Sequence, residues 1–196
     1  MSDQDFGGAN MEALLKEDQY YTYDNYRTWE DGERWELIDG KAFAMSPAPS
    51  WIHQGTSGNL YLQFASYLKG KACRVFHAPF DVRLNADTLD DTVVQPDIVV
   101  ICDRSKLSGT GCVGAPDMVI EILSPATARY DRTLKFDIYR RAGIREYWIV
   151  DPDTKTVAVH ILKNGEYMIR AYTDADSVAV HILEGCTINL ADVFED

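Results

Sequence analysis

No stretch of the chain limits its possible folds as strongly as residues 118–123, which are apolar at every position except Glu121. A strand that is apolar on both sides is typical of the centre of a sheet covered on both faces. Residues 98–101 form a second run of this kind, made entirely of Ile and Val. Because both runs are short and lie between turn-forming residues, they predict buried strands rather than helices. The fold is therefore expected to place other layers on both faces of a central sheet.

The rest of the pattern predicts a mixed α/β (α+β) fold, in which helices flank a mixed sheet. Helices are expected at residues 22–30, with Thr22 as the N-cap, at 50–68 and at 131–142, where Gly143 ends the last one. Asp39 and Gly40 favour a tight hairpin turn between strands 34–38 and 41–45. Further strands are expected at residues 74–76, 80–84, 95–101, 117–123, 146–150, 156–162, 166–172 and 177–182.

The chain of 196 residues suits one folded domain at residues 19–196, preceded by a flexible acidic segment at residues 1–18. Its net charge of −12 disfavours tight binding to nucleic acid. Much of the excess lies at the two ends, because residues 1–18 have a net charge of −4 and residues 174–196 one of −6. Residues 129–145 have instead a net charge of +4. Since phosphate binding depends on where the basic groups lie, a nucleic-acid partner stays compatible with this composition.

Three carboxylates stand in apolar, strand-like surroundings. Glu121 interrupts the central run, Asp97 precedes residues 98–101, and Glu36 lies within the first strand of the hairpin. A buried carboxylate needs a cation, a metal or a proton as partner. Each one alone has an ordinary explanation, since an Asp after Pro96 often belongs to a turn and a Glu in a hairpin often faces water. Together they suggest a site.

A lysine also faces the expected sheet. On a helical wheel of residues 131–142, Lys135 falls on the apolar side with Ile138 and Tyr139, whereas Arg140 and Arg141 point outward. Lys135 is therefore expected to approach the carboxylates. A structural ion pair with Glu121 or Asp97 is the alternative to a catalytic role.

The compartment is expected to be the cytoplasm. The chain begins MSDQDF and has no basic segment followed by an apolar one, so no signal peptide is evident. The four cysteines, Cys73, Cys102, Cys112 and Cys186, show no metal-finger spacing and are expected to be reduced structural thiols.

Several motifs, in order, resemble those of the Uma-type putative restriction endonuclease family, a branch of the PD-(D/E)xK nuclease superfamily. The resemblance covers residues 21–194, nearly the whole chain. It implies a restriction-endonuclease-like fold and an endonuclease that hydrolyses phosphodiester bonds, most readily those of DNA. The matching segments are Trp-Glu36-Leu-Ile-Asp-Gly, Pro96-Asp97, Glu121-Ile-Leu-Ser-Pro125, Tyr130-Asp-Arg-Thr-Leu-Lys135, Tyr139-Arg-Arg-Ala-Gly143 and Glu146-Tyr-Trp-Ile-Val-Asp-Pro152.

The resemblance also implies a set of functional residues. Asp97, Glu121, the carbonyl of Ile122 and Glu36 would hold Mg²⁺ or Mn²⁺. The superfamily motif expects a lysine at position 123, which is Leu here, so the catalytic lysine would be Lys135. His53, Arg129 and Arg132 are candidates for contacting the substrate, although each also has an ordinary structural or solvated role.

Two other functions stay open. One is a catalytically silent module of the same fold that binds nucleic acid or protein, which the acidic ends favour. The other is a metal-dependent phosphohydrolase that acts on small nucleotides, which an acidic surface tolerates. A homodimer is a further expectation, because two-fold symmetry suits an enzyme that cuts both strands of a duplex.

Overall fold

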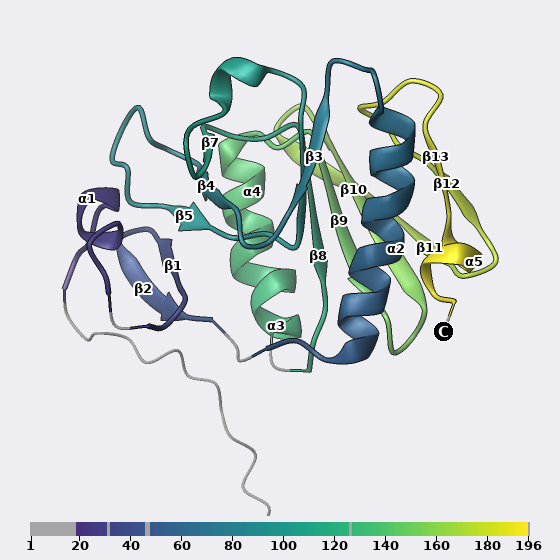
Figure 1. Ribbon diagram of the computed structural model, residues 1–196, viewed down its shortest axis with the longest axis horizontal. Helices are drawn as coiled ribbons and strands as arrows, with labels where there is room; N and C mark the ends of the chain where they lie inside the picture. Colours follow the sequence, from purple (N-terminus) through teal and green to yellow (C-terminus); the bar gives the residue numbers. More distant parts are fainter. Residues whose placement is uncertain (1–18, 31, 46–47, 126, 196) are drawn as a thin grey trace, which may run out of the picture.

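The computed structural model describes residues 19–30, 32–45, 48–125 and 127–195 (Figure 1). Its main sheet has six strands in the order β11-β10-β9-β8-β6-β3. Strands β8 and β9 are parallel, and the other neighbours are antiparallel. The strands are β3 (Arg74–His77), β6 (Ile98–Ile101), β8 (Met118–Ile122), β9 (Glu146–Asp151), β10 (Thr156–Lys163) and β11 (Glu166–Thr173). The expected acidic segment at residues 1–18 lies outside the described residues.

Strands β6 and β8 are buried along their whole length, which confirms the prediction of central strands covered on both faces. Helix α2 (Trp51–Leu68) covers one face, where Leu60 and Phe64 pack against β6, β8 and β9 (Figure 1). The other face is covered by α4 (Phe136–Ala142), through Ile138 and Tyr139. The side of α2 that faces the sheet is set by Leu60, Phe64 and Leu68, which recur at helical spacing and are buried.

A second, five-stranded sheet has the order β2-β1-β5-β4-β7. Its strands are β1 (Trp35–Ile38), β2 (Lys41–Ala44), β4 (Asp81–Arg83), β5 (Val93–Val94) and β7 (Gly111–Val113). The predicted hairpin is confirmed, and Asp39 and Gly40 have φ angles of 48° and 75°, as a primed turn requires. The first helix, α1 (Tyr23–Tyr26), begins after Thr22 as predicted but is shorter than the expected 22–30.

Two strand predictions were wrong in detail. Residues 95–101 do not form one strand, because Pro96 has no N–H and the N–H of Gln95 is bound by the Glu36 carboxylate at 2.9 Å. Residues 177–182 do not extend the main sheet. Strand β12 (Ser177–Ala179) pairs with β13 (Thr187–Asn189), which leads into α5 (Leu190–Val193).

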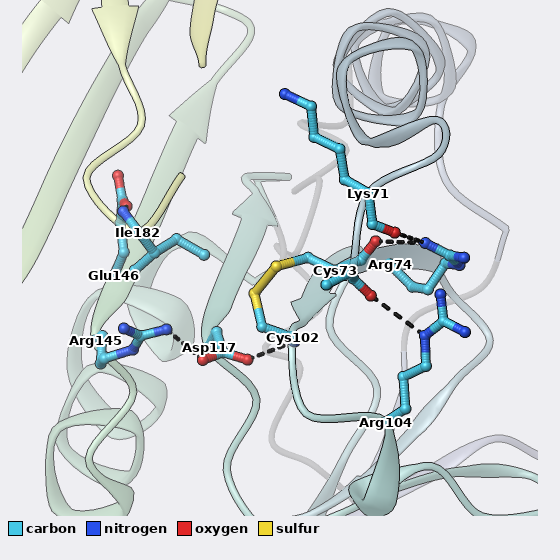
Figure 2. Close-up of a disulfide and its surroundings, with 10 residues drawn as sticks. Lys71, Cys73, Arg74, Cys102, Arg104, Asp117, Arg145, Glu146 and Ile182 are labelled. Carbon is cyan, nitrogen blue, oxygen red and sulfur yellow. Dashed lines mark hydrogen bonds and ion pairs between the residues drawn. A yellow bond between two sulfur atoms is a disulfide. The ribbon is translucent and has the colours of Figure 1, made fainter. Parts of the chain in front are cut away.

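The prediction of four reduced cysteines was also wrong. Cys73 and Cys102 form a disulfide, drawn in Figure 2, whereas Cys112 and Cys186 are free and buried. The reason is the register of β3 and β6, which pairs Arg74 with Ile101 and so places Cys73 opposite Cys102. A cross-strand register of this kind is a tertiary feature that cysteine spacing does not reveal.

The helix expected at residues 131–142 begins earlier and is not regular. It consists of α3 (Ala128–Tyr130), a π-helical segment η2 (Asp131–Lys135) and α4. Gly143 ends it with a φ of 80°, as predicted. Within the described ranges, no helix is both long and apolar enough to span a bilayer.

Candidate active site

The Lys135 ammonium lies between two carboxylates from different sheets. Its Nζ is 3.0 Å from Glu36 Oε1 on β1 and 2.9 Å from Glu121 Oε1 on β8. Lys135 is only 5% exposed, so the inward direction predicted from the helical wheel is confirmed. Glu36 and Glu121 are equally buried, at 4% and 3% exposed. Such a buried group of charges is stable only if its members pair with one another.

A second group of contacts surrounds Asp97. The N–H of Ile122 donates to Asp97 Oδ2 at 2.7 Å, and His53 Nε2 lies 3.3 Å from the same oxygen. His53 Nε2 also lies 3.0 Å from the carbonyl oxygen of Ile122. Ser50 caps α2 by accepting the N–H of His53, which fixes the helix end that presents this imidazole.

The two groups are adjacent. Because β6 pairs antiparallel with β8, with Ile98 opposite Ile120, Asp97 lies beside Glu121 on the same face of the sheet. The N–H of Asp97 lies 3.4 Å from Glu121 Oε2. The structure therefore brings together five of the predicted site residues, namely Glu36, His53, Asp97, Glu121 and Lys135.

Two members of the site were missed in the sequence. Tyr139 donates a hydrogen bond of 2.6 Å to Glu121 Oε1, and Asp131 Oδ1 is 3.8 Å from Lys135 Nζ. Both are buried. The available signal was the helical wheel, which places Asp131 on the apolar side of its helix, where a lone carboxylate needs an explanation.

The two predicted arginines lie elsewhere. Arg132 Nη2 pairs with Asp151 at 3.1 Å, and Arg129 is exposed to solvent. Among the residues described, neither guanidinium forms an ion pair with a carboxylate of the site. Contact with a substrate stays a prediction for both.

Burial governs the protonation of the site. It raises the pKa of Glu121 to about 8, although the charge of Lys135 acts in the opposite direction. Burial likewise raises the pKa of Asp131 to about 6. For Lys135, burial lowers the pKa, but the charges of Glu121, Glu36 and Asp131 outweigh it and leave the pKa well above its ordinary value. The ammonium is thus a fixed positive charge.

The pKa of the His53 imidazole, like that of Lys135, is raised by neighbouring groups. Burial lowers its pKa, but the hydrogen bond and charge of Asp97, together with the Ile122 carbonyl, raise it to a net value above the ordinary one. The cluster therefore has four carboxyl groups facing one ammonium and one imidazole. The excess of negative charge is lowered when carboxyl groups of the cluster keep their protons, and a bound cation would lower it too.

The oxygen donors suit a hard divalent cation. Lys135 and Tyr139 contact Glu121 Oε1, whereas Glu121 Oε2 faces the N–H of Asp97. Asp97 Oδ2 and the Ile122 carbonyl both face His53 Nε2, so a cation bound by them would take the place of this contact. In the part of the chain that is described, no three side chains of His, Cys, Asp or Glu form a ready metal cage. Two carboxylates and a carbonyl nevertheless fit Mg²⁺, which keeps several of its waters.

Comparison with known proteins decides the family. The model of the Uma2 family, described as "Putative restriction endonuclease", matches residues 19–191. The chain belongs to the Uma2 family. An uncharacterized Synechocystis protein is 29% identical to this Uma2 chain over 157 residues, which are 78% of this chain and 80% of the relative.

A solved structure shows the same fold. It is described as a putative nuclease belonging to DUF820 from Anabaena variabilis, and it matches with a TM-score of 0.72 at 23% identity. The match covers 89% of the Uma2 chain and 97% of the Anabaena protein. The expected restriction-endonuclease-like, mixed α and β fold is thereby confirmed.

Proposed function

We propose that this Uma2 protein is a divalent-metal-dependent endonuclease that hydrolyses phosphodiester bonds of nucleic acid, most readily DNA. The family description and the Anabaena nuclease support a nuclease-like role in general terms. The observation on which the specific proposal depends is the buried Lys135 ammonium, which contacts Glu36 and Glu121 beside Asp97. A structural ion pair alone would not need additional carboxylates at the same point.

Each residue has a distinct role in this proposal. Mg²⁺ or Mn²⁺ would be held by Asp97, Glu121 Oε2 and the Ile122 carbonyl. Glu36 would act through Lys135 or through a bound water. When bound, the metal would lower the pKa of a water and offset negative charge on the phosphate. Lys135 would orient that water and stabilise the charge that develops on phosphorus oxygens in the transition state. Tyr139 and Glu36 would hold Glu121 and Lys135 in place.

The test is nicking of supercoiled plasmid DNA by pure protein with Mg²⁺, Mn²⁺ or EDTA. Cutting is expected only with metal, and Glu121→Gln, Asp97→Asn and Lys135→Ala should abolish it. The matched controls Glu184→Gln and Lys69→Ala change exposed residues of the same types and should cut normally. Circular dichroism establishes that each variant is folded. Site variants that are folded and cut as fast as the wild type would refute the assignment.

Because a net charge of −12 disfavours binding to nucleic acid, the same experiment also tests two alternative functions. Nucleic-acid or protein binding without cutting would indicate a silent module. Release of phosphate from nucleotides, with no cutting of polymers, would indicate a phosphohydrolase instead.

We further propose that the protein acts on its nucleic acid in the cytoplasm as a homodimer formed through α2. This 18-residue helix contains no Asp, Glu, Lys or Arg. It exposes Trp51 by 73% and Leu62 by 64%. In a chain with a charge of −12, an uncharged apolar face lets a second copy approach with the least repulsion.

A further inference from the structure

Two buried side-chain polar atoms in the described residues have no hydrogen-bond partner. They are Nδ1 of His53 and the hydroxyl of Tyr130. Folded proteins leave few buried polar atoms unpaired, because each one loses its bonds to water without replacement. His53 and Tyr130 come from elements on opposite faces of the main sheet, yet both border the carboxylate cluster. Of the two, the Tyr130 hydroxyl belongs to a ring beside Lys135, so it is the one available to a group bound at the cluster.

Tyr130 is placed beside the reacting groups by its neighbours. Its ring lies 5.5 Å from the ring of Phe43 on β2, measured between centroids. Lys135 Nζ is 5.6 Å from the Tyr130 centroid. Burial, and then the nearby charge of Glu36, raise the pKa of the phenol far above its ordinary value. Tyr130 therefore stays protonated and can serve as a hydrogen-bond donor.

The other donors of the site are already occupied. Lys135 contacts Glu36, Glu121 and Asp131, and Tyr139 donates to Glu121. A phosphate oxygen that enters among carboxylates can be bound by a further donor only if that donor has no other partner and keeps its proton. Among the described groups around Lys135, the Tyr130 hydroxyl meets these conditions.

We propose that the Tyr130 hydroxyl donates a hydrogen bond to a non-bridging oxygen of the substrate's phosphodiester. The inference rests on the proposed nuclease function and adds a substrate-binding residue to it.

The variant Tyr130→Phe tests the proposal, because it removes one oxygen atom and nothing else. An unpaired hydroxyl contributes no folded-state bond, so the thermal unfolding midpoint should stay the same or rise. The matched control is Tyr167→Phe, whose hydroxyl donates to the Ile144 carbonyl at 2.9 Å away from the cluster. That variant should unfold at a lower temperature and cut DNA normally.

Binding is measured by the anisotropy of fluorescein-labelled duplex and single-stranded DNA in Ca²⁺, and KM and kcat are measured in Mg²⁺. Tyr130→Phe should raise the dissociation constant and lower kcat/KM about tenfold or more, as expected for the loss of a hydrogen bond to a charged group. If Tyr130→Phe binds and cuts as the wild type does, the inference fails and the nuclease function stands. If Tyr130→Phe unfolds as early as Tyr167→Phe, the hydroxyl has a structural partner and the inference also fails. A wild-type protein that neither binds nor cuts any nucleic acid would refute the proposed function and this inference together.

Discussion

At the scale of single residues, the site is governed by how much negative charge is buried around Lys135. Glu121 contacts Lys135 and Tyr139 through one oxygen, and Asp131 adds a further carboxylate nearby. A fully buried carboxylic acid keeps its proton more firmly than the same group in an unfolded chain. The sequence could indicate which carboxylates were out of place, but their mutual distances depend on the pairing of β6 with β8, which no local pattern encodes.

A pH dependence of stability follows from Glu121. Its pKa rises from an ordinary 4.5 to about 8 in the folded protein, so the folded state binds the proton more tightly than the unfolded state. The free energy of unfolding should therefore fall as the pH rises between these values, by at most about 1.4 kcal/mol per pH unit. Urea denaturation at a series of pH values, from acid to mildly alkaline, measures this change in the free energy of unfolding.

The variant Glu121→Gln should remove most of this slope, because the amide does not titrate. Glu184→Gln, at an exposed position, should retain the wild-type slope. Mg²⁺ should flatten the slope in the wild type, since it favours the ionised carboxylate. An unfolding free energy that rises steadily with pH over this range would contradict the protonation described for Glu121.

At the scale of elements, the predictions made from local sequence rules succeeded at turns and helix ends. The start of α1 after Thr22, the Asp39-Gly40 turn and the end of the helix at Gly143 are confirmed, because each depends on neighbouring residues. The predictions failed where a distant group intervened. The N–H of Gln95 binds Glu36, so the strand expected at residues 95–101 is shortened to β6. The pairing of Cys73 with Cys102 likewise depends on a register set far along the chain.

The hairpin turn offers a test at this scale. Gly40 has a φ of 75°, and a Cβ there would overlap the ring of Tyr20. Gly40→Ala should therefore lower the free energy of unfolding by about 1–2 kcal/mol from backbone conformation alone, with the clash adding to it. Gly109→Ala is the control, because its Cβ would meet nothing within 4 Å and its φ is not in the left-handed region. Urea denaturation compares the two, and equal stability for both variants would show that the turn is not constrained in this way.

At the scale of the whole molecule, charge and surface decide how copies of the chain can meet. A net charge of −12 makes most encounters between two copies repulsive, whereas α2 presents a face with no charged residue. The outer side of this helix is open, because a Cβ added to Gly55 or Gly58 would meet nothing within 4 Å. In a dimer with two-fold symmetry, α2 of one copy would lie against α2 of the other, and the glycines would allow the two helices to approach closely.

The wild-type protein should therefore elute as a dimer in size-exclusion chromatography with light scattering. Leu62→Glu should give a monomer with an unchanged circular dichroism spectrum, because it puts two like charges into the proposed contact. Leu89→Glu is the matched control, since Leu89 is 66% exposed and lies outside α2, and it should stay dimeric. A wild-type protein that is monomeric at every concentration, or a Leu62→Glu variant that still dimerises, would exclude α2 as the contact. Because this helix also presents His53 to Asp97, a dimer built on it would hold both sites at fixed separation, so the Leu62→Glu monomer should nick one strand but lose concerted cleavage of both.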